Sequence, residues 1–128
     1  MTSTKTAAEK VATVVIPVSD QDAMIDFYVD KLGLTKRVDI PFGNGYRWVE
    51  VAPGEAETTI ALAPPPEGGE SGNRGTGISL YSSDVEGYHA QLKAEGVDVD
   101  DEISRMGDPV PPMFWLRDPE GNSLLVIG

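Results

Sequence analysis

The stretches TVVIPVSD (Thr13–Asp20) and GISLYSSD (Gly77–Asp84) decide the fold, because they repeat one pattern 64 residues apart. In each stretch an apolar strand ends in Ser-Asp, a pair that favours the N-cap of a helix. A glycine suited to a left-handed helix exit follows in each half, Gly33 and then Gly96. Neither short half could bury its apolar face alone, so the repeat predicts two similar modules around a shared cavity.

The length and charge of the chain limit its class. The 128 residues carry a formal net charge of −11 and contain no cysteine. This length predicts one domain over residues 1–128, with modules at about 10–63 and 77–128 and a Pro- and Gly-rich linker at 64–76. Residues 1–9 are predicted to form a mobile tail.

The acidity argues against nucleic acid and anionic membranes as partners, since both require clustered Lys and Arg. The absence of cysteine excludes disulfides and thiolate metal sites. The N-terminus has no apolar core of a signal peptide, and no apolar run is long enough to span a membrane. We therefore expect a soluble cytoplasmic protein.

Both halves have the pattern β-α-β-β-β. In the first half, a helix from Ser19 or Asp20 to Gly33 interrupts predicted strands at 11–18, 34–40, 46–51 and 58–63. In the second half, a strand at 77–82 and a helix at 85–95 are followed by a segment at 97–101 and by strands at 113–117 and 123–127. The third strand of this half is expected to be weak or missing. The segment DPEGN (118–122) predicts a tight turn between the last two strands.

Three segments together resemble the vicinal oxygen chelate superfamily, which includes glyoxalase I, bleomycin-resistance proteins and extradiol dioxygenases. They are IPVSDQDAMIDFYVDKLGL (16–34), SDVEGYHAQLKAEGV (83–97) and LRDPEGNSLLVI (116–127). The resemblance implies an α+β fold of two tandem β-α-β-β-β modules whose eight strands form an open cup. It also implies a homodimer.

Enzymes of this superfamily hold a divalent metal in the cup with His and Glu ligands on the first and last strands of each half. The resemblance places these positions at Thr13, Ala61, Gly77 and Leu125. None has the imidazole or carboxylate that zinc, nickel or iron requires. The only histidine, His89, falls on the second helix and is predicted to lie on the surface. We therefore expect no metal and no other cofactor.

Period-two alternation along the strands identifies the residues that line the cup. Trp48 and Trp115 would then line one largely apolar cavity, with few polar anchors. Alternatively, these aromatic residues fill the core between the sheets or a dimer seam. The candidate ligand-binding residues are Thr13, Val15, Trp48, Glu50, Ala61, Ser79, Tyr81, Met113, Trp115, Arg117 and Leu125.

Three functions remain open at this point. The first is a metal-independent small-molecule binding protein with an apolar or aromatic ligand. The acidity of the chain favours a ligand that is positively charged. The second is a metal-independent isomerase or lyase in which Glu50 removes a proton and Arg117 or Tyr81 stabilises the oxyanion. The third is an interaction module that has kept the scaffold and lost the chemistry. A metal-dependent glyoxalase or dioxygenase is the least favoured.

Overall fold

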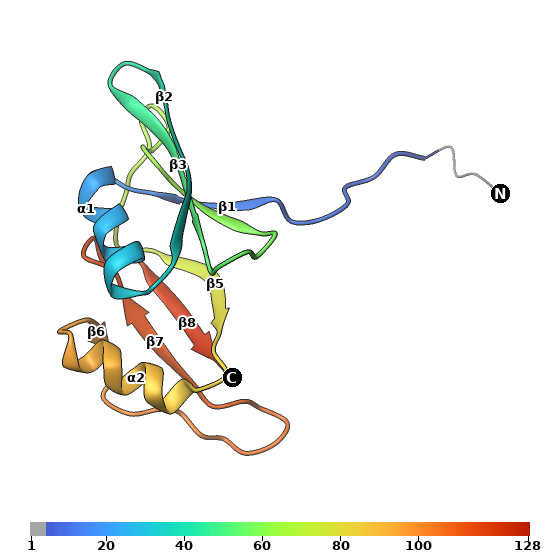
Figure 1. Ribbon diagram of the computed structural model, residues 1–128, viewed down its shortest axis with the longest axis vertical. Coiled ribbons are helices and arrows are strands. Elements are labelled where there is room, and N and C mark those ends of the chain that lie inside the picture. The colour runs from blue at the N-terminus through green and yellow to red at the C-terminus, as the bar shows by residue number, and fades with distance from the viewer. Residues whose placement is uncertain (1–4) are drawn as a thin grey trace.

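The computed structural model describes residues 5–128, which fold into two sheets with the same strand order. The N-terminal sheet runs β1-β4-β3-β2 and the C-terminal sheet runs β5-β8-β7-β6. The N-terminal module forms the upper half of Figure 1 and the C-terminal module the lower half. The predicted α+β fold of two tandem modules is confirmed. The first four residues of the predicted tail lie outside the described part of the chain.

The helices and strands follow the predicted order. The N-terminal module contains β1 (Thr13–Pro17), α1 (Gln21–Asp26), the π-helix η1 (Phe27–Lys31), β2 (Thr35–Gly43), β3 (Tyr46–Ala52) and β4 (Thr59–Ala63). The C-terminal module contains β5 (Gly75–Tyr81), α2 (Val85–Ala94), β6 (Asp98–Val99), β7 (Met113–Arg117) and β8 (Ser123–Ile127). The weak strand is the two-residue β6, which is the second strand of the C-terminal module, whereas the sequence predicted the third. Within residues 5–128, none of the helices is long and apolar enough to cross a membrane.

The first helix departs from the predicted single helix. The Asp20 side chain caps α1 by accepting a hydrogen bond from the Ala23 N–H at 3.0 Å. After α1 the chain widens into η1, where the Leu32 N–H donates to the Phe27 carbonyl five residues earlier at 3.1 Å. The wider turn accompanies burial of the consecutive rings of Phe27 and Tyr28, which pack edge to face.

Strand β2 is longer than predicted, because Pro41 does not end it. This strand lies at the edge of its sheet, where a residue without an N–H removes no ladder hydrogen bond. The β2–β3 hairpin therefore continues beyond the body of the module (Figure 1). Its additional length brings Phe42 into the sheet.

The apolar residues that alternation assigns to the helix side form the core. Val14 and Ile78 also fall on this side by the alternation, but both are only half-buried. They lie on β1 and β5, which are edge strands, so no further strand covers them. The fully buried members are Ile16, Val49, Val51, Leu62, Phe114, Leu116, Leu124 and Val126.

The turn between β7 and β8 joins the two modules. The Tyr28 hydroxyl donates to Asp118 Oδ2 at 2.8 Å, and Tyr28 is 0% exposed. Burial and the neighbouring Asp118 carboxylate raise the pKa of Tyr28, so its phenol remains a donor. The Glu120 carboxylate accepts from the N–H groups of Ser19 and Asp20 at 2.9–3.0 Å, just before α1. The second module thus anchors the start and the middle of the first helix.

We expect Tyr28→Phe to lower the free energy of unfolding by about 1–3 kcal/mol, because it leaves a buried carboxylate without one of its donors. Urea denaturation followed by circular dichroism measures this change. Tyr46→Phe is the control, because Tyr46 is exposed, and we expect a change within about 0.5 kcal/mol. Equal effects of the two substitutions would contradict the assigned role of the Tyr28–Asp118 bond.

Candidate functional site

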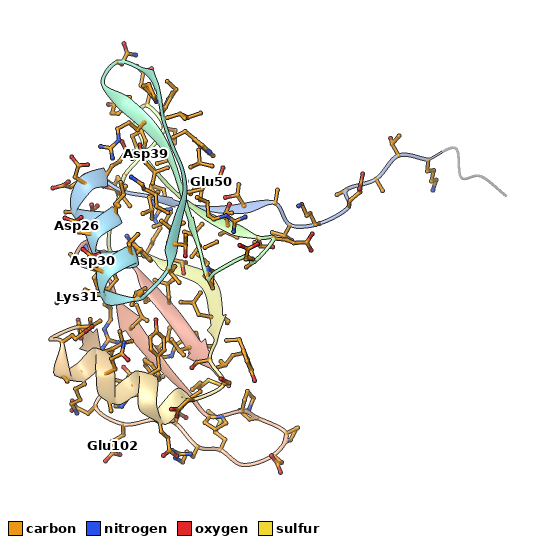
Figure 2. All side chains as sticks on the ribbon, viewed as in Figure 1. Asp26, Asp30, Lys31, Asp39, Glu50 and Glu102 are labelled. Atoms are coloured by element: carbon orange, nitrogen blue, oxygen red, sulfur yellow. The ribbon has the colours of Figure 1, made fainter. Side chains whose placement is uncertain are left out.

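One row of paired residues crosses the N-terminal sheet on the side away from the helix. Val15 pairs with Ala61, Ala61 with Glu50, and Glu50 with Val38. Residues paired in this way point to the same face of a sheet, and their neighbours along each strand point to the other. Figure 2 shows Glu50 on the opposite side of the sheet from Asp26. We call this helix-free side the open face.

The C-terminal sheet has an equivalent open face. Ser79 pairs with Leu125, and Leu125 pairs with Trp115. The neighbouring Phe114 packs against Tyr88 and His89 of α2, so Trp115 points away from that helix. The next row on the same face consists of Tyr81, Ile127 and Met113.

The predicted site residues differ in how much of each side chain is exposed to solvent. Val15, Tyr81 and Trp115 are 49%, 76% and 43% exposed, whereas Ala61 is fully buried. Ser79 is exposed, and the side chains half-buried on the open faces are those of Trp48, Glu50, Met113, Arg117 and Leu125. The Thr13 hydroxyl donates to the Thr59 carbonyl at 3.2 Å.

Three exposed apolar residues on the N-terminal open face were not among the predicted site residues. Ile40 pairs with Trp48, and Tyr46 precedes Trp48 by two residues on the same strand. The Phe42 ring stacks on Tyr46 with their centroids 6.1 Å apart. Continuing the alternation back from Trp48 would have identified Tyr46. Ile40 lay inside the predicted strand at 34–40, whereas Phe42 depended on the unpredicted continuation of β2 through Pro41.

The two tryptophans belong to different sheets of the chain. Within residues 5–128, no ring contact and no side-chain hydrogen bond joins Trp48 to Trp115. An apolar cavity of about 320 Å³ lies instead at the seam between the modules, where Val14 and Ile60 face Ile78 and Leu80. A shared cavity between the tryptophans therefore remains a prediction.

Glu50 is held as a carboxylate by two neighbouring donors. Trp48 Nε1–H donates to Glu50 Oε2 at 2.6 Å, and the Thr59 hydroxyl donates to Glu50 Oε1 at 2.7 Å. The Thr59 and Trp48 hydrogen bonds together lower the pKa of Glu50, and this effect exceeds the opposing one of burial. Glu50 is therefore ionised at neutral pH.

Arg117 is already neutralised on the open face. Its guanidinium donates to Asp98 and Asp100, with both N–O distances at 2.9 Å. These hydrogen bonds raise the pKa of Arg117, and the bond from Arg117 lowers the pKa of Asp98. The group of one guanidinium and two carboxylates has a net negative charge.

The surface position predicted for His89 is wrong. His89 is buried against Phe114, with ring centroids 4.8 Å apart. Its Nε2 lies 2.6 Å from the Asp100 carbonyl, which can only accept, so Nε2 carries the proton. The histidine thus holds the backbone of Asp100, whose carboxylate binds Arg117 on the other side of the sheet.

The residues that the resemblance assigns to the superfamily's metal positions do not fit a metal. Ala61, Gly77 and Leu125 have no donor atom in their side chains, and the Thr13 hydroxyl is bonded to a carbonyl. In the part of the chain that the structure describes, no three His, Asp or Glu side chains come together as a possible metal site.

Comparison with known proteins gives a consistent result over the whole fold. A family model described as Glyoxalase/Bleomycin resistance protein/Dioxygenase superfamily matches residues 10–126. The protein YetH of Bacillus subtilis (strain 168), described as uncharacterized, is 29% identical over 123 residues, which cover 92% of this chain and 97% of YetH.

Two crystal structures are similar in both fold and sequence. One is TnmS3, an antibiotic binding protein from Streptomyces sp. CB03234, with 32% identity, a TM-score of 0.81, and coverage of 96% of this chain and 98% of TnmS3. The other is a glyoxalase/bleomycin resistance protein/dioxygenase superfamily member from Sphaerobacter thermophilus DSM 20745. Its sequence is 32% identical and the TM-score is 0.84, and the alignment covers 94% of this chain and 97% of the Sphaerobacter chain.

We expect Thr59→Val to raise the pKa of Glu50, because the lost hydroxyl stabilises only the ionised form. Carbon-detected NMR of the glutamate carboxyl groups over an acid titration measures this shift. Thr58→Val is the control, since the Thr58 hydroxyl donates to the Val11 carbonyl and not to Glu50. An unchanged Glu50 titration in Thr59→Val would contradict the assigned donor.

Proposed function

The chain belongs to the glyoxalase/bleomycin resistance protein/dioxygenase superfamily, and from this membership we propose that it is a metal-independent small-molecule binding protein. Its ligand is a flat, apolar or aromatic molecule. The open faces of the two sheets provide the contact surface.

The observation that carries this proposal is the distribution of exposed apolar side chains. A soluble chain leaves large apolar groups grouped on its surface mainly where something binds. Helices α1 and α2 cover one side of each sheet, and most of the exposed large apolar residues are on or stacked against the other side. They are Val15, Ile40, Phe42, Tyr46, Tyr81 and Trp115.

The similarity to TnmS3, an antibiotic binding protein, supports this proposal. An identity of 32% over 96% of the chain extends through both modules, so it includes every strand of the open faces. Binding requires only a complementary surface, and aromatic side chains provide large contact area at little conformational cost.

Metal independence rests on the chemistry of the side chains at the superfamily's ligand positions. Apolar or absent side chains at Ala61, Gly77 and Leu125 provide room for a ligand and no coordination. We therefore expect binding to be unaffected by chelators and by added zinc or nickel.

The alternative function, an isomerase or lyase using Glu50, is less well supported. A general base near neutral pH requires a carboxyl group whose pKa is raised. The Thr59 and Trp48 hydrogen bonds lower the pKa of Glu50 instead. Arg117, proposed to stabilise an oxyanion, is bonded to two carboxylates.

The proposal includes a homodimer. Trp48 and Trp115 lie on separate sheets, and a second copy could place the N-terminal open face of one chain opposite the C-terminal open face of the other. Strands β1 and β5 each have one edge that pairs with no other strand of residues 5–128, where such a copy could pack.

We expect a solution mass of twice the 13.7 kDa of the chain. Sedimentation equilibrium across a range of protein concentrations measures it. A constant mass of one chain would contradict the dimer and leave each open face as a separate binding surface.

We expect Trp115→Ser to weaken binding of planar aromatic ligands at least tenfold, about 1.4 kcal/mol, because it removes an exposed ring from the open face. Isothermal titration in the presence of EDTA, with acridine and bleomycin-type glycopeptides as probes, measures this. Met106→Ser is the matched control, since Met106 is 72% exposed but lies outside both sheets. Absence of saturable binding by the unmodified protein would overturn the proposed function.

A further inference from the structure

We propose that Glu50 is the residue that selects the charge of the ligand, and that the ligand is a planar aromatic molecule with a protonated nitrogen bearing N–H groups. This inference rests on the proposed binding function and adds a ligand class and a specificity residue to it. It follows from how Glu50 is held, from what surrounds it, and from how the arginines near the open faces are occupied.

The geometry of Glu50 favours an ionic donor as its partner. Each of its carboxylate oxygens accepts one short hydrogen bond, from Trp48 and from Thr59. A carboxylate has about four acceptor positions, so each oxygen retains capacity for another donor. Thr59 is only 6% exposed and Trp48 lies two residues away on the same strand, so both donors come from ordered parts of the sheet. The carboxylate is thus fixed in position while still able to bind N–H groups.

The positive charge of Arg37 contributes to lowering the pKa of Glu50, but Arg37 forms no ion pair with it. Among the ion pairs of residues 5–128, none includes Glu50. Its cross-strand neighbours are Ala61 and Val38, which provide no counter-charge. Next to apolar side chains, an unpaired charge attracts a cation more strongly than it would in bulk water.

The arginines that could otherwise bind an anion are already occupied. Arg47 is bonded to Asp22 at 2.7 Å and to Asp39 at 2.9 Å, and Arg117 to Asp98 and Asp100. Arg37 donates to the carbonyl oxygens of Gly54 and Ala56 at 3.2 and 2.9 Å.

An anionic ligand would therefore meet the negative Glu50 on one sheet and the net negative Arg117 group on the other. A cation would be attracted to both groups. The net charge of −11 acts in the same direction over the whole molecule.

Trp48 explains why the cation should be attached to an aromatic system. Its indole N–H is committed to Glu50, which holds the ring beside the carboxylate. An aromatic cation can then contact the ring and the carboxylate together, which combines ring stacking, cation–π attraction and an ionic hydrogen bond.

The test compares 9-aminoacridine, a cation at neutral pH, with acridine, which has the same ring system and is neutral. Isothermal titration at low salt should show at least tenfold tighter binding of 9-aminoacridine to the unmodified protein. Added salt should lower the binding affinity of 9-aminoacridine and leave that of acridine nearly unchanged, because salt screens only interactions between charges.

Glu50→Gln is the decisive variant, because the amide can still accept from Trp48 or Thr59 while the charge is lost. It should remove most of the difference in affinity between 9-aminoacridine and acridine, and circular dichroism checks that the variant is folded. Glu57→Gln removes the same charge from a side chain that is 84% exposed, and should alter neither affinity.

The outcomes separate this inference from the proposed function. Equal affinity of the two compounds for the unmodified protein, or equal effects of Glu50→Gln and Glu57→Gln, would overturn charge selection and leave aromatic binding intact. Binding of neither compound would overturn both.

Discussion

The buried hydrogen bond between Tyr28 and Asp118 is the interaction on which the arrangement of the two modules depends. Asp118 also accepts from the backbone N–H groups of Glu120 and Asn122 at 2.9 Å and from the Asn122 side chain at 3.0 Å. One buried carboxylate thus organises the β7–β8 turn and receives a donor from the first helix. The turn in turn presents Glu120 to the start of α1. Removing one of these donors destabilises the fold, because the buried Asp118 carboxylate then loses a hydrogen bond that water cannot replace.

This connection holds the first helix against the C-terminal module, while α2 packs on its own sheet through Phe114. With Phe114 packed on α2 and Val49 and Val51 in the core, the alternating residues must point to the open faces. The sheets therefore keep exposed apolar side chains that the core cannot absorb. Burying one such aromatic side chain against a ligand or a second chain contributes on the order of 1.5–3 kcal/mol.

The polar residues of the open faces divide into neutralised and unneutralised groups. Arg117 is bound to two carboxylates, and His89 holds the backbone of one of them, Asp100, from the opposite side of the sheet. Glu50 receives only uncharged donors. The same residue type can be a structural partner or a recognition point, and here the difference lies in whether a cation is already bonded to it.

The fold could be predicted from the sequence because it depends on local and repeated patterns. The Ser-Asp caps, the left-handed exits at Gly33 and Gly96 and the alternation within each strand are short-range properties, and the structure has them as predicted. The positions of Trp48, Glu50 and Trp115 on the side away from the helices followed from the same alternation. The bonds of Glu50 to Thr59, of His89 to Asp100 and of Tyr28 to Asp118 could not be predicted, because they join residues on different elements. Local patterns determine which face of a sheet a side chain occupies. The hydrogen-bond partners of that side chain, and therefore its pKa, depend on strand register and packing, which arise only when distant segments of the chain meet.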